Sequence, residues 1–224
     1  MKILIIEDEK NLAESIGQYL SGEYYLCEFA TTFKEALEKV ETFQYDCILL
    51  DLMLPDGEGM QILHELKNQR KQDGIIIISA RDSIEDKIQG LQTGADDYIA
   101  KPFHLSELAA RIHSVIRRKQ FGSTNNIEQN EIKIDLLAKT VSINDSPVAF
   151  TKKQLDLLLY FIGNKNRVIS KSALAEHLSG DIADILESHD FIYAHIKNLK
   201  KKLVEAGYGN YLKTVYGSGY KWEV

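Results

Sequence analysis

Residues 47–59, CILLDLMLPDGEG, join a run of consecutive apolar side chains to an aspartate and then to a turn. A strand that is apolar at every position is typical of a parallel sheet covered on both faces. Similar runs occur at 2–6 (KILII) and 74–79 (GIIIIS), and Pro55-Asp56-Gly57 supplies turn residues. Because these runs alternate with helical patterns, the first half of the chain predicts a doubly wound α/β domain.

Polar side chains stand at the ends of the predicted strands. Parallel strands gather their carboxyl ends at one edge of the sheet, so we expect these side chains to share one cleft. They are Glu7 and Asp8 after KILII, Asp51 after CILL, Ser79 at the end of GIIIIS, and Lys101 after DDYIA.

The predicted cleft has the chemistry of a phosphoryl-transfer site. Clustered carboxylates repel one another, and a hard divalent cation such as Mg2+ relieves that repulsion. Asp51 is then the candidate nucleophile toward a phosphoryl group. Lys101 would supply positive charge and Ser79 a hydroxyl donor for the phosphoryl oxygens. The simpler alternative, unrelated carboxylates in solvent, leaves the lysine and the serine at the remaining strand ends unexplained.

Length and hydropathy favour two cytoplasmic domains. A chain of 224 residues can build two cores. The sequence begins with one short apolar run that turns acidic at Glu7, and we find no apolar stretch of membrane-spanning length. We therefore expect a cytoplasmic protein with no membrane partner. Cys27 and Cys47 lack metal-site spacing and are expected to be reduced thiols.

The net charge of −6 is divided unevenly along the chain. Residues 1–120 carry 14 basic and 21 acidic side chains, a balance of −7, and residues 121–224 carry 13 and 12, a balance of +1. Within 195–221 there are six lysines and one glutamate, a balance of +5. A basic stripe confined to one end of one domain indicates a polyanionic partner.

The second half of the chain has a different pattern. Residues 120–130 are polar and turn-rich, and we interpret them as a linker between a domain at 1–119 and a domain at 131–224. Residues 131–150 alternate apolar and polar side chains around Asn144-Asp145, which predicts a small antiparallel sheet.

Three helices and a hairpin complete the second predicted domain. Thr151, Ser170 and Ser188 are candidate N-caps. Two strands around Gly217-Ser218-Gly219 predict the hairpin, so the whole pattern indicates an α+β winged helix-turn-helix. The third helix has an apolar face for core packing, made by Phe191, Ile192, Ile196, Leu199 and Leu203.

The other face of that third helix is basic. A solvated lysine face is the ordinary interpretation of such a cluster, but this helix occupies the recognition position and precedes a basic wing. We therefore expect binding to double-stranded DNA. The expected contacts are Tyr193, Lys197, Asn198 and Lys201 in the helix, with Lys213, Thr214 and Tyr216 in the wing.

The motifs resemble those of a known family. ILIIEDE (3–9), CILLDLMLPDGEG (47–59), GIIIISAR (74–81) and GADDYIAKPF (94–103) resemble the five-stranded, flavodoxin-like receiver domain of bacterial two-component response regulators. FTKKQLDLLLYF, NRVISKSALAEHL, HIKNLKKKL and TVYGSGYKW resemble the winged-helix effector domain of the OmpR/PhoB family. The third helix departs from that pattern because it has lysines at positions where members of the family commonly have arginines.

The resemblance implies roles for individual receiver residues. Asp51 would be the phosphoacceptor, and Glu7, Asp8, Asp51 and the backbone carbonyl of Met53 would bind Mg2+. Lys101 would precede a cis-proline, Pro102, and Ser79 and Tyr98 would form a switch pair. Tyr98 has a simpler alternative role, as an amphipathic residue of an edge strand.

The resemblance also implies a two-fold receiver interface. Lys87, Asp97, Glu107 and Arg111 would pair across it, although surface ion pairs of little energetic weight are the alternative. The implied protein is a DNA-binding transcriptional response regulator rather than an enzyme, apart from catalysing its own phosphoryl transfer and slow dephosphorylation. A sensor histidine kinase would activate it, and the homodimer would bind tandem half-sites. Contact with RNA polymerase stays open.

Two other functions compete with this interpretation. One is a phosphorylation-independent DNA-binding regulator with a vestigial receiver. The other is a Mg2+-dependent aspartyl-phosphate phosphotransferase or hydrolase. Haloacid-dehalogenase-type enzymes of that kind have a second Asp two positions after the nucleophile, where this chain has Met53.

Overall fold

The computed structural model describes residues 1–122, 124–179, 188–209 and 211–223 of the chain. The chain divides into two compact units, Met1–Gly122 and Ser123–Val224. No helix in the described part of the chain has both the length and the apolar character that crossing a membrane requires.

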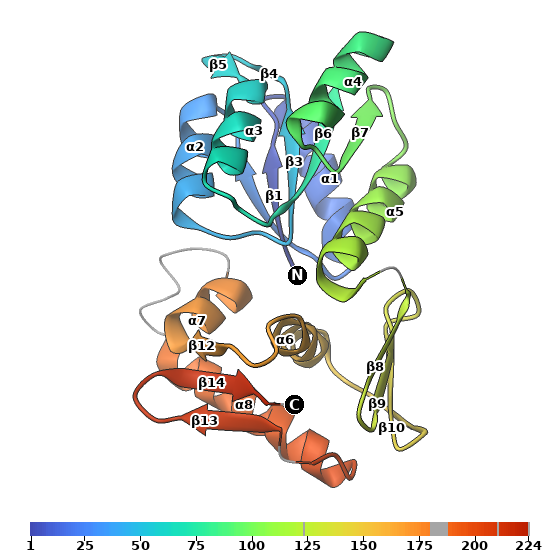
Figure 1. Cartoon of the computed structure of the whole chain (residues 1–224), viewed down its shortest axis with the longest axis vertical. Coiled ribbons are helices and arrows are strands. Elements are labelled where there is room, and N and C mark those ends of the chain that lie inside the picture. The colour runs from blue at the N-terminus through green and yellow to red at the C-terminus, as the bar shows by residue number, and fades with distance from the viewer. Residues whose placement is uncertain (123, 180–187, 210, 224) are drawn as a thin grey trace. The chain divides into compact units, whose positions relative to one another are not determined.

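The N-terminal unit is built on a five-stranded parallel sheet with strand order β2-β1-β3-β6-β7. Helices connect successive strands, which confirms the expected doubly wound α/β fold (Figure 1). The strands are β1 (Lys2–Ile6), β2 (Leu26–Ala30), β3 (Cys47–Asp51), β6 (Gly74–Ser79) and β7 (Asp97–Ala100). The helices are α1 (Lys10–Gly22), α2 (Phe33–Thr42), α3 (Gly59–Asn68), α4 (Ile84–Thr93) and α5 (Leu105–Ile116), which continues into a π-helical turn (Arg117–Phe121).

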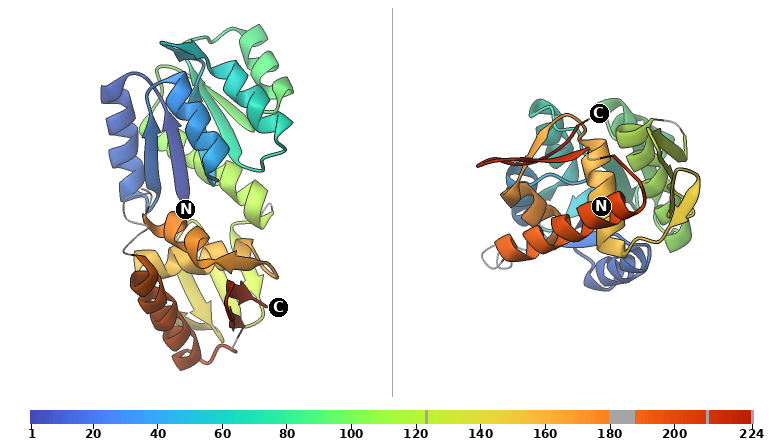
Figure 2. Two further views of the ribbon diagram at one scale, coloured as in Figure 1. Left: turned by 90° about the vertical axis from the view of Figure 1, so that its left-hand side faces the viewer. Right: turned by 90° about the horizontal axis from the view of Figure 1, so that it is seen from below.

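Helices cover both faces of this sheet (Figures 1 and 2). Successive side chains of a strand point to opposite faces, so a strand must be apolar throughout when both faces are buried. In β3, Cys47 and Leu49 join the core layer under α1 and α5, whereas Ile48 and Leu50 join the layer under α2 and α3. Burial on both sides explains the unbroken apolar run and fixes where the strand delivers Asp51.

The loop after β3 is tied to the amino end of α2. Two short strands, β4 (Met53–Leu54) and β5 (Gly57–Glu58), pair on either side of the expected turn. The Asp56 carboxylate in this turn accepts hydrogen bonds from the backbone N–H of Phe33 (2.6 Å) and of Lys34 (3.2 Å). These bonds satisfy otherwise unpaired N–H groups of the first helical turn.

The C-terminal unit begins with a four-stranded antiparallel sheet. Asn144 and Asp145 both have positive φ (51° and 60°), the backbone of the tight hairpin turn expected there. Strand β8 lies in the segment that we interpreted as a linker. Its NIEQ sequence is polar and so does not indicate a strand, but its backbone pairs with β9 at the edge of the sheet. The strands are β8 (Asn126–Gln129), β9 (Ile132–Asp135), β10 (Thr140–Ile143) and β11 (Ser146–Val148).

The rest of this unit is a helical layer with a small antiparallel sheet of strand order β12-β14-β13. The Thr151 side chain accepts from the Gln154 N–H (3.3 Å) and the Gln154 side chain from the Thr151 N–H (3.0 Å), so the expected N-cap is part of a capping box. Ser170 caps the second helix as expected, whereas the cap expected from the Ser188 side chain lies outside the described residues. The elements are α6 (Lys152–Gly163), β12 (Val168–Ser170), α7 (Lys171–Ser179), α8 (Ser188–Glu205), β13 (Leu212–Val215) and β14 (Gly219–Trp222).

Candidate functional site

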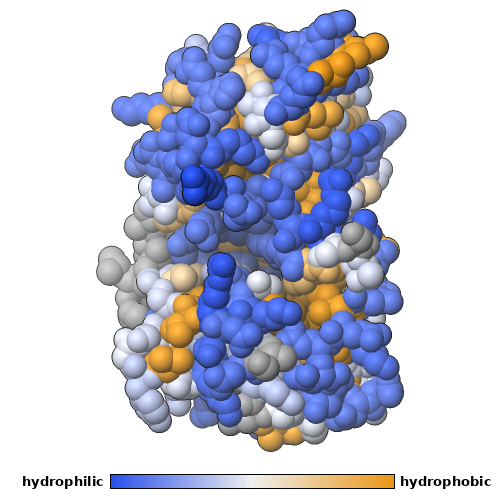
Figure 3. Space-filling view, viewed as in Figure 1, coloured by the Kyte–Doolittle hydropathy of each residue, from blue (hydrophilic) through white to orange (hydrophobic). Residues whose placement is uncertain are grey.

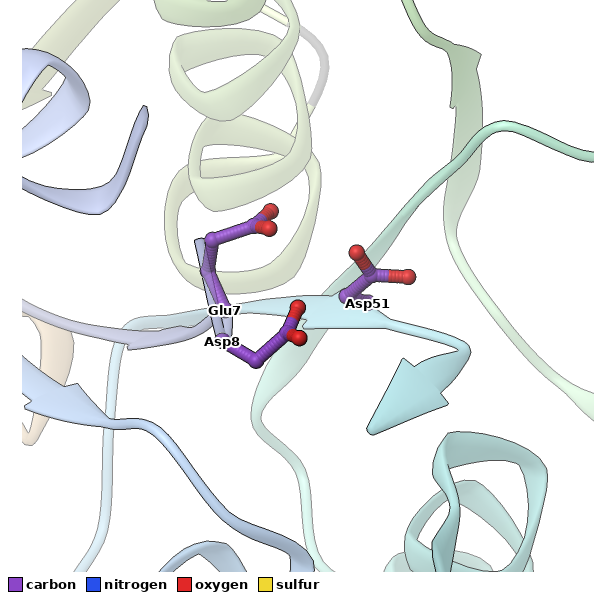
Figure 4. A group of neighbouring side chains, drawn as sticks. All are labelled: Glu7, Asp8 and Asp51. Carbon is purple, nitrogen blue, oxygen red and sulfur yellow. The ribbon is translucent and has the colours of Figure 1, made fainter. Parts of the chain in front are cut away.

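An acidic cluster lies at the carboxyl ends of β1 and β3. One ligand oxygen from each of Glu7, Asp8 and Asp51 lies within 4.8 Å of the others, and the Glu7 and Asp8 side chains extend toward Asp51 (Figure 4). Glu7 and Asp51 are buried, whereas Asp8 is exposed. The sheet therefore brings together the carboxylates that the strand-end argument placed in one cleft.

Lys101 bridges the two buried carboxylates. Its Nζ lies 2.8 Å from both Oε atoms of Glu7 and 2.6 Å from Asp51 Oδ2. Burial raises the pKa of Glu7, and the hydrogen bond from Lys101 only partly offsets that rise. Burial also lowers the pKa of Lys101, but its bonds to Asp51 and Glu7 outweigh this effect and hold that pKa above its usual value. The peptide bond from Lys101 to Pro102 is cis, as expected.

The donor set of this cluster fits Mg2+. Three carboxylates and one ammonium leave the site with excess negative charge, and carboxylate oxygens are hard ligands of the kind that Mg2+ prefers. The Met53 N–H donates to Asp51 Oδ1 (2.9 Å), so the residue expected to offer its carbonyl to the metal is already bonded to the candidate nucleophile. Glu7, Asp8, Asp51 and the Met53 carbonyl are the groups that would hold the ion.

Ser79 and Tyr98 lie on neighbouring strands beside the cluster. Ser79 is fully buried at the end of β6, where its Oγ accepts from the Arg81 N–H (3.2 Å). The Tyr98 ring is also buried, and its hydroxyl donates to the Arg81 carbonyl (2.5 Å). Burial raises the pKa of Tyr98, and a hydrogen bond with Ser79 partly offsets the rise. The expected pair is therefore connected both by this contact and through Arg81, whose backbone bonds both side chains.

Gly90 makes room for the Tyr98 ring, a role that the sequence analysis missed. A Cβ at position 90, in the middle of α4, would lie 2.6 Å from Ile77 Cδ1 and 3.3 Å from Tyr98 Cδ2. A glycine inside a helical pattern costs stability relative to alanine, so it often marks a close contact. That signal was present in the sequence, but it did not identify the neighbour.

The four charged residues expected at a dimer interface lie on α4, β7 and α5. The Arg111 guanidinium bonds the Asp97 carboxylate (2.9 and 3.1 Å) and Glu107 Oε1 (2.8 and 3.0 Å) within one chain. Among the ion pairs of the described residues, none joins Lys87 to Glu107. Within the chain, Arg111 is thus the partner of both acidic groups.

The outer face of α4 is apolar. Ile84, Ile88 and Leu91 follow helical spacing on one side of the helix, and Ile84 is 71% exposed. Figure 3 shows hydrophobic side chains gathered at the upper right, over α4 of Figure 1. Isolated exposed apolar residues are common, but a row of three indicates an interaction surface.

Helix α8 presents one buried and one exposed face. Ile192, Ile196, Leu199 and Leu203 are buried as expected. Lys200, which is half-buried, donates to the Thr214 hydroxyl (2.9 Å) and so ties α8 to β13. All seven expected DNA contacts are exposed: Tyr193, Lys197, Asn198, Lys201, Lys213, Thr214 and Tyr216.

Phe191 departs from the expected core face of α8. The ring is 37% exposed, and the Lys153 ammonium lies 4.5 Å from its centroid. The expectation that Phe191 belongs to the core is therefore wrong. Its helical position lies at the margin of the apolar face, where α6 covers only part of the ring.

A doubly wound domain with this acidic cluster, followed by a winged helix, defines a transcriptional response regulator. The model of the response regulator receiver domain matches residues 3–113, and that of the transcriptional regulatory protein C-terminal domain matches residues 145–222. The chain belongs to the OmpR/PhoB family of two-component response regulators, which are DNA-binding transcription factors.

Relatives match along nearly their whole length. Response regulator ArlR of Staphylococcus haemolyticus is 38% identical over 218 residues, which are 97% of each chain. Transcriptional regulatory protein PmrA of Pectobacterium parmentieri is 35% identical over 220 residues, covering 98% of this chain and 96% of its own. The receiver domain of Francisella response regulator 1452 is 38% identical with a TM-score of 0.51, covering 52% of this chain and 97% of that structure.

Proposed function

We propose that Asp51 is phosphorylated in the cytoplasm by a sensor histidine kinase, with Mg2+ bound, and that this promotes receiver dimerisation and binding to tandem DNA half-sites. The observation that carries the proposal is the bridge of Lys101 between Glu7 and Asp51. The Lys101 ammonium already contacts the candidate nucleophile. It can therefore bind the negatively charged phosphoryl oxygens once the group is attached to Asp51.

The chemistry assigns one task to each side chain. An Asp51 oxygen attacks phosphorus, the bond to the donor breaks, and the leaving group takes the displaced electron pair. The Met53 N–H fixes the rotation of the Asp51 carboxylate. Lys101 and the Ser79 hydroxyl then bind phosphoryl oxygens. Bound Mg2+ would supply charge neutralisation for the carboxylates and the incoming group.

The proposed output of the receiver is a symmetric dimer through α4, β7 and α5. Movement of Ser79 toward the phosphoryl group changes the surroundings of Arg81 and Tyr98, which adjoin α4. The exposed apolar row on α4 supports this surface. Because Arg111 bonds Asp97 and Glu107 within one chain, pairing across a two-fold axis requires an exchange of partners or a shared network.

The proposed DNA interface is the exposed face of α8 with the wing. Tyr193, Lys197, Asn198 and Lys201 would enter the major groove, and the wing residues Lys213, Thr214 and Tyr216 would approach phosphate or the minor groove. The exposure of these side chains and the +5 balance of residues 195–221 support this. A receiver dimer would hold two such helices near paired half-sites. RNA polymerase is a further proposed partner.

Labelling of Asp51 tests the proposal. Incubation of the whole chain with Mg2+ and acetyl phosphate or phosphoramidate should add one phosphoryl group by intact mass. Asp51→Ala should abolish the addition and EDTA should slow it greatly. Asp82→Ala, which removes an exposed carboxylate from the loop after β6, is the matched control and should label normally. Undiminished labelling of Asp51→Ala would refute the assignment.

A further inference from the structure

The exposed side of α8 carries a stripe of four side chains. Phe191, Ala194, Asn198 and Lys201 are all exposed, at the spacing i, i+3, i+7 and i+10 of one helix face. The buried residues of α8 lie on the opposite side. Because that packing fixes the rotation of the helix, these four residues lie on the side that α8 would turn toward a major groove.

The Phe191 ring has a charged side chain and an aromatic side chain as neighbours. The Lys153 ammonium lies 4.5 Å from its centroid, and the His195 ring meets it at 4.3 Å in an edge-on arrangement of 73°. Burial lowers the pKa of His195, and the charge of Lys153 lowers it further. Lys153 and His195 thus lie against two sides of the Phe191 ring, and 37% of Phe191 is exposed to solvent.

An aromatic ring on this stripe can read one feature of DNA. The thymine C5-methyl is the apolar group that base edges present in the major groove, and phenylalanine can contact it. Asn198 lies seven residues further on, about 10.5 Å along the helix, which is about three base steps. Asparagine pairs with adenine through N6 and N7. The stripe therefore suits a site with A·T pairs at two separated positions.

We propose that Phe191 contacts the C5-methyl group of a thymine in the major groove and is a specificity-determining residue of this regulator. The inference rests on the proposed placement of α8 in the groove. An exposed aromatic without function would be an ordinary alternative, since single apolar residues on surfaces are common. The two interpretations predict different changes in binding affinity when one thymine methyl group is removed from the DNA.

Deoxyuracil substitution removes that methyl group and leaves base pairing unchanged. The probe is a duplex that the whole phosphorylated protein selects from a random library, with each thymine replaced in turn. Wild type should lose about three- to tenfold in affinity at one position per half-site, the range expected for losing an apolar methyl contact. Phe191→Ala should bind the unmodified duplex more weakly by a similar factor and should be insensitive to uracil at that position.

Two further variants complete the design. Val204→Ala truncates another exposed apolar side chain of α8 that is not on the stripe, and it should keep both the affinity and the uracil sensitivity of wild type. Phe191→Gln replaces the ring with a polar, helix-compatible chain and should also lose the sensitivity. Circular dichroism establishes that each variant is folded, so Phe191→Gln tests the contact if Phe191→Ala does not fold.

Each outcome decides a different point. If wild type selects a sequence but uracil weakens binding at no position, or if both Phe191 variants keep the wild-type sensitivity, the methyl contact is refuted while DNA binding stands. If wild type selects no sequence at all, the proposed placement of α8 fails as well. Loss of sensitivity at one position, confined to the Phe191 variants, supports the inference.

Discussion

At the residue scale, Lys101 compensates only part of the charge that Glu7, Asp8 and Asp51 bring to one edge of the sheet. Burying a carboxylate is unfavourable unless it is paired, and here one ammonium serves two buried carboxylates. The raised pKa of Glu7 is the signature of that imbalance. Binding of the proposed Mg2+ would relieve this repulsion, so the cluster would lower stability for the sake of function, a common cost.

Glu7→Gln should stabilise the receiver at pH 7 in EDTA. The folded-state pKa of Glu7 lies above its usual value of 4.5, so its contribution to stability is present below pH 4.5 and is lost as pH rises through the folded pKa. The advantage of the variant should therefore disappear below pH 4.5. Native-state hydrogen exchange of β1 and β3 amides across this pH range measures the difference within the receiver.

Added Mg2+ provides the control for this prediction. An ion at 100 times its Kd should stabilise wild type by about 2.7 kcal/mol. The same concentration should stabilise Glu7→Gln less, because a ligand is missing. A variant that is less stable than wild type at pH 7 in EDTA would show that Lys101 satisfies Glu7 fully.

At the element scale, the helices of the C-terminal unit depend on local caps. Thr151 and Gln154 each accept the other's backbone N–H at the start of α6. Helix α6 in turn places Lys153 over Phe191 of α8. A cap at one helix end thus helps to position a side chain of the proposed DNA-reading face.

Thr151→Ala should destabilise the C-terminal unit by about 1 kcal/mol, because one N–H of the first helical turn loses its acceptor. Trp222, the single tryptophan of the chain, is fully buried in this unit and reports its unfolding by fluorescence in urea. Thr151→Ser keeps the hydroxyl and should retain the wild-type midpoint. Equal midpoints for all three proteins would mean that the capping box contributes nothing measurable.

The sequence predicted an element correctly where a single physical cause, such as burial on both faces, determines the pattern of its side chains. Strands β1, β3 and β6 have unbroken apolar interiors because helices cover both faces, and the ends of β1 and β3 place Glu7, Asp8 and Asp51. Strand β8 was missed because an edge strand is held by backbone pairing, which leaves its side chains free to be polar. Strand β12 has only three residues, too few for a pattern.

Side-chain placement between elements was harder to predict. The exposure of Phe191 depends on how much of its ring α6 covers. The neighbours of Gly90 lie on two strands, β6 and β7, so spacing within the helix could not identify them. The intrachain bonds of Arg111 likewise depend on the packing of α5 against β7.

At the scale of the whole molecule, the two units differ in charge. Residues 1–120 have a balance of −7, and the basic stretch 195–221 has a balance of +5. Attraction to DNA is therefore concentrated on one unit, and a single winged helix offers few phosphate contacts. Pairing two chains doubles those contacts, so receiver dimerisation would control affinity through the number of helices bound together.

Charge exchange between two chains tests whether Asp97 and Arg111 pair across the dimer. After treatment with phosphoramidate and Mg2+, Asp97→Arg and Arg111→Glu should each dimerise roughly tenfold more weakly than wild type, since two symmetric attractions become repulsions. An equimolar mixture should recover dimerisation, because the introduced arginine of one chain then meets the introduced glutamate of the other, while the remaining native Arg111 meets the remaining native Asp97. Within each mutant chain the like charges still repel, so local ion pairs cannot explain recovery.

Sedimentation velocity measures the dimer fraction, and Ile88→Glu in both chains should abolish it by placing charge on the apolar face of α4. A mixture that dimerises no better than its components would exclude this pairing.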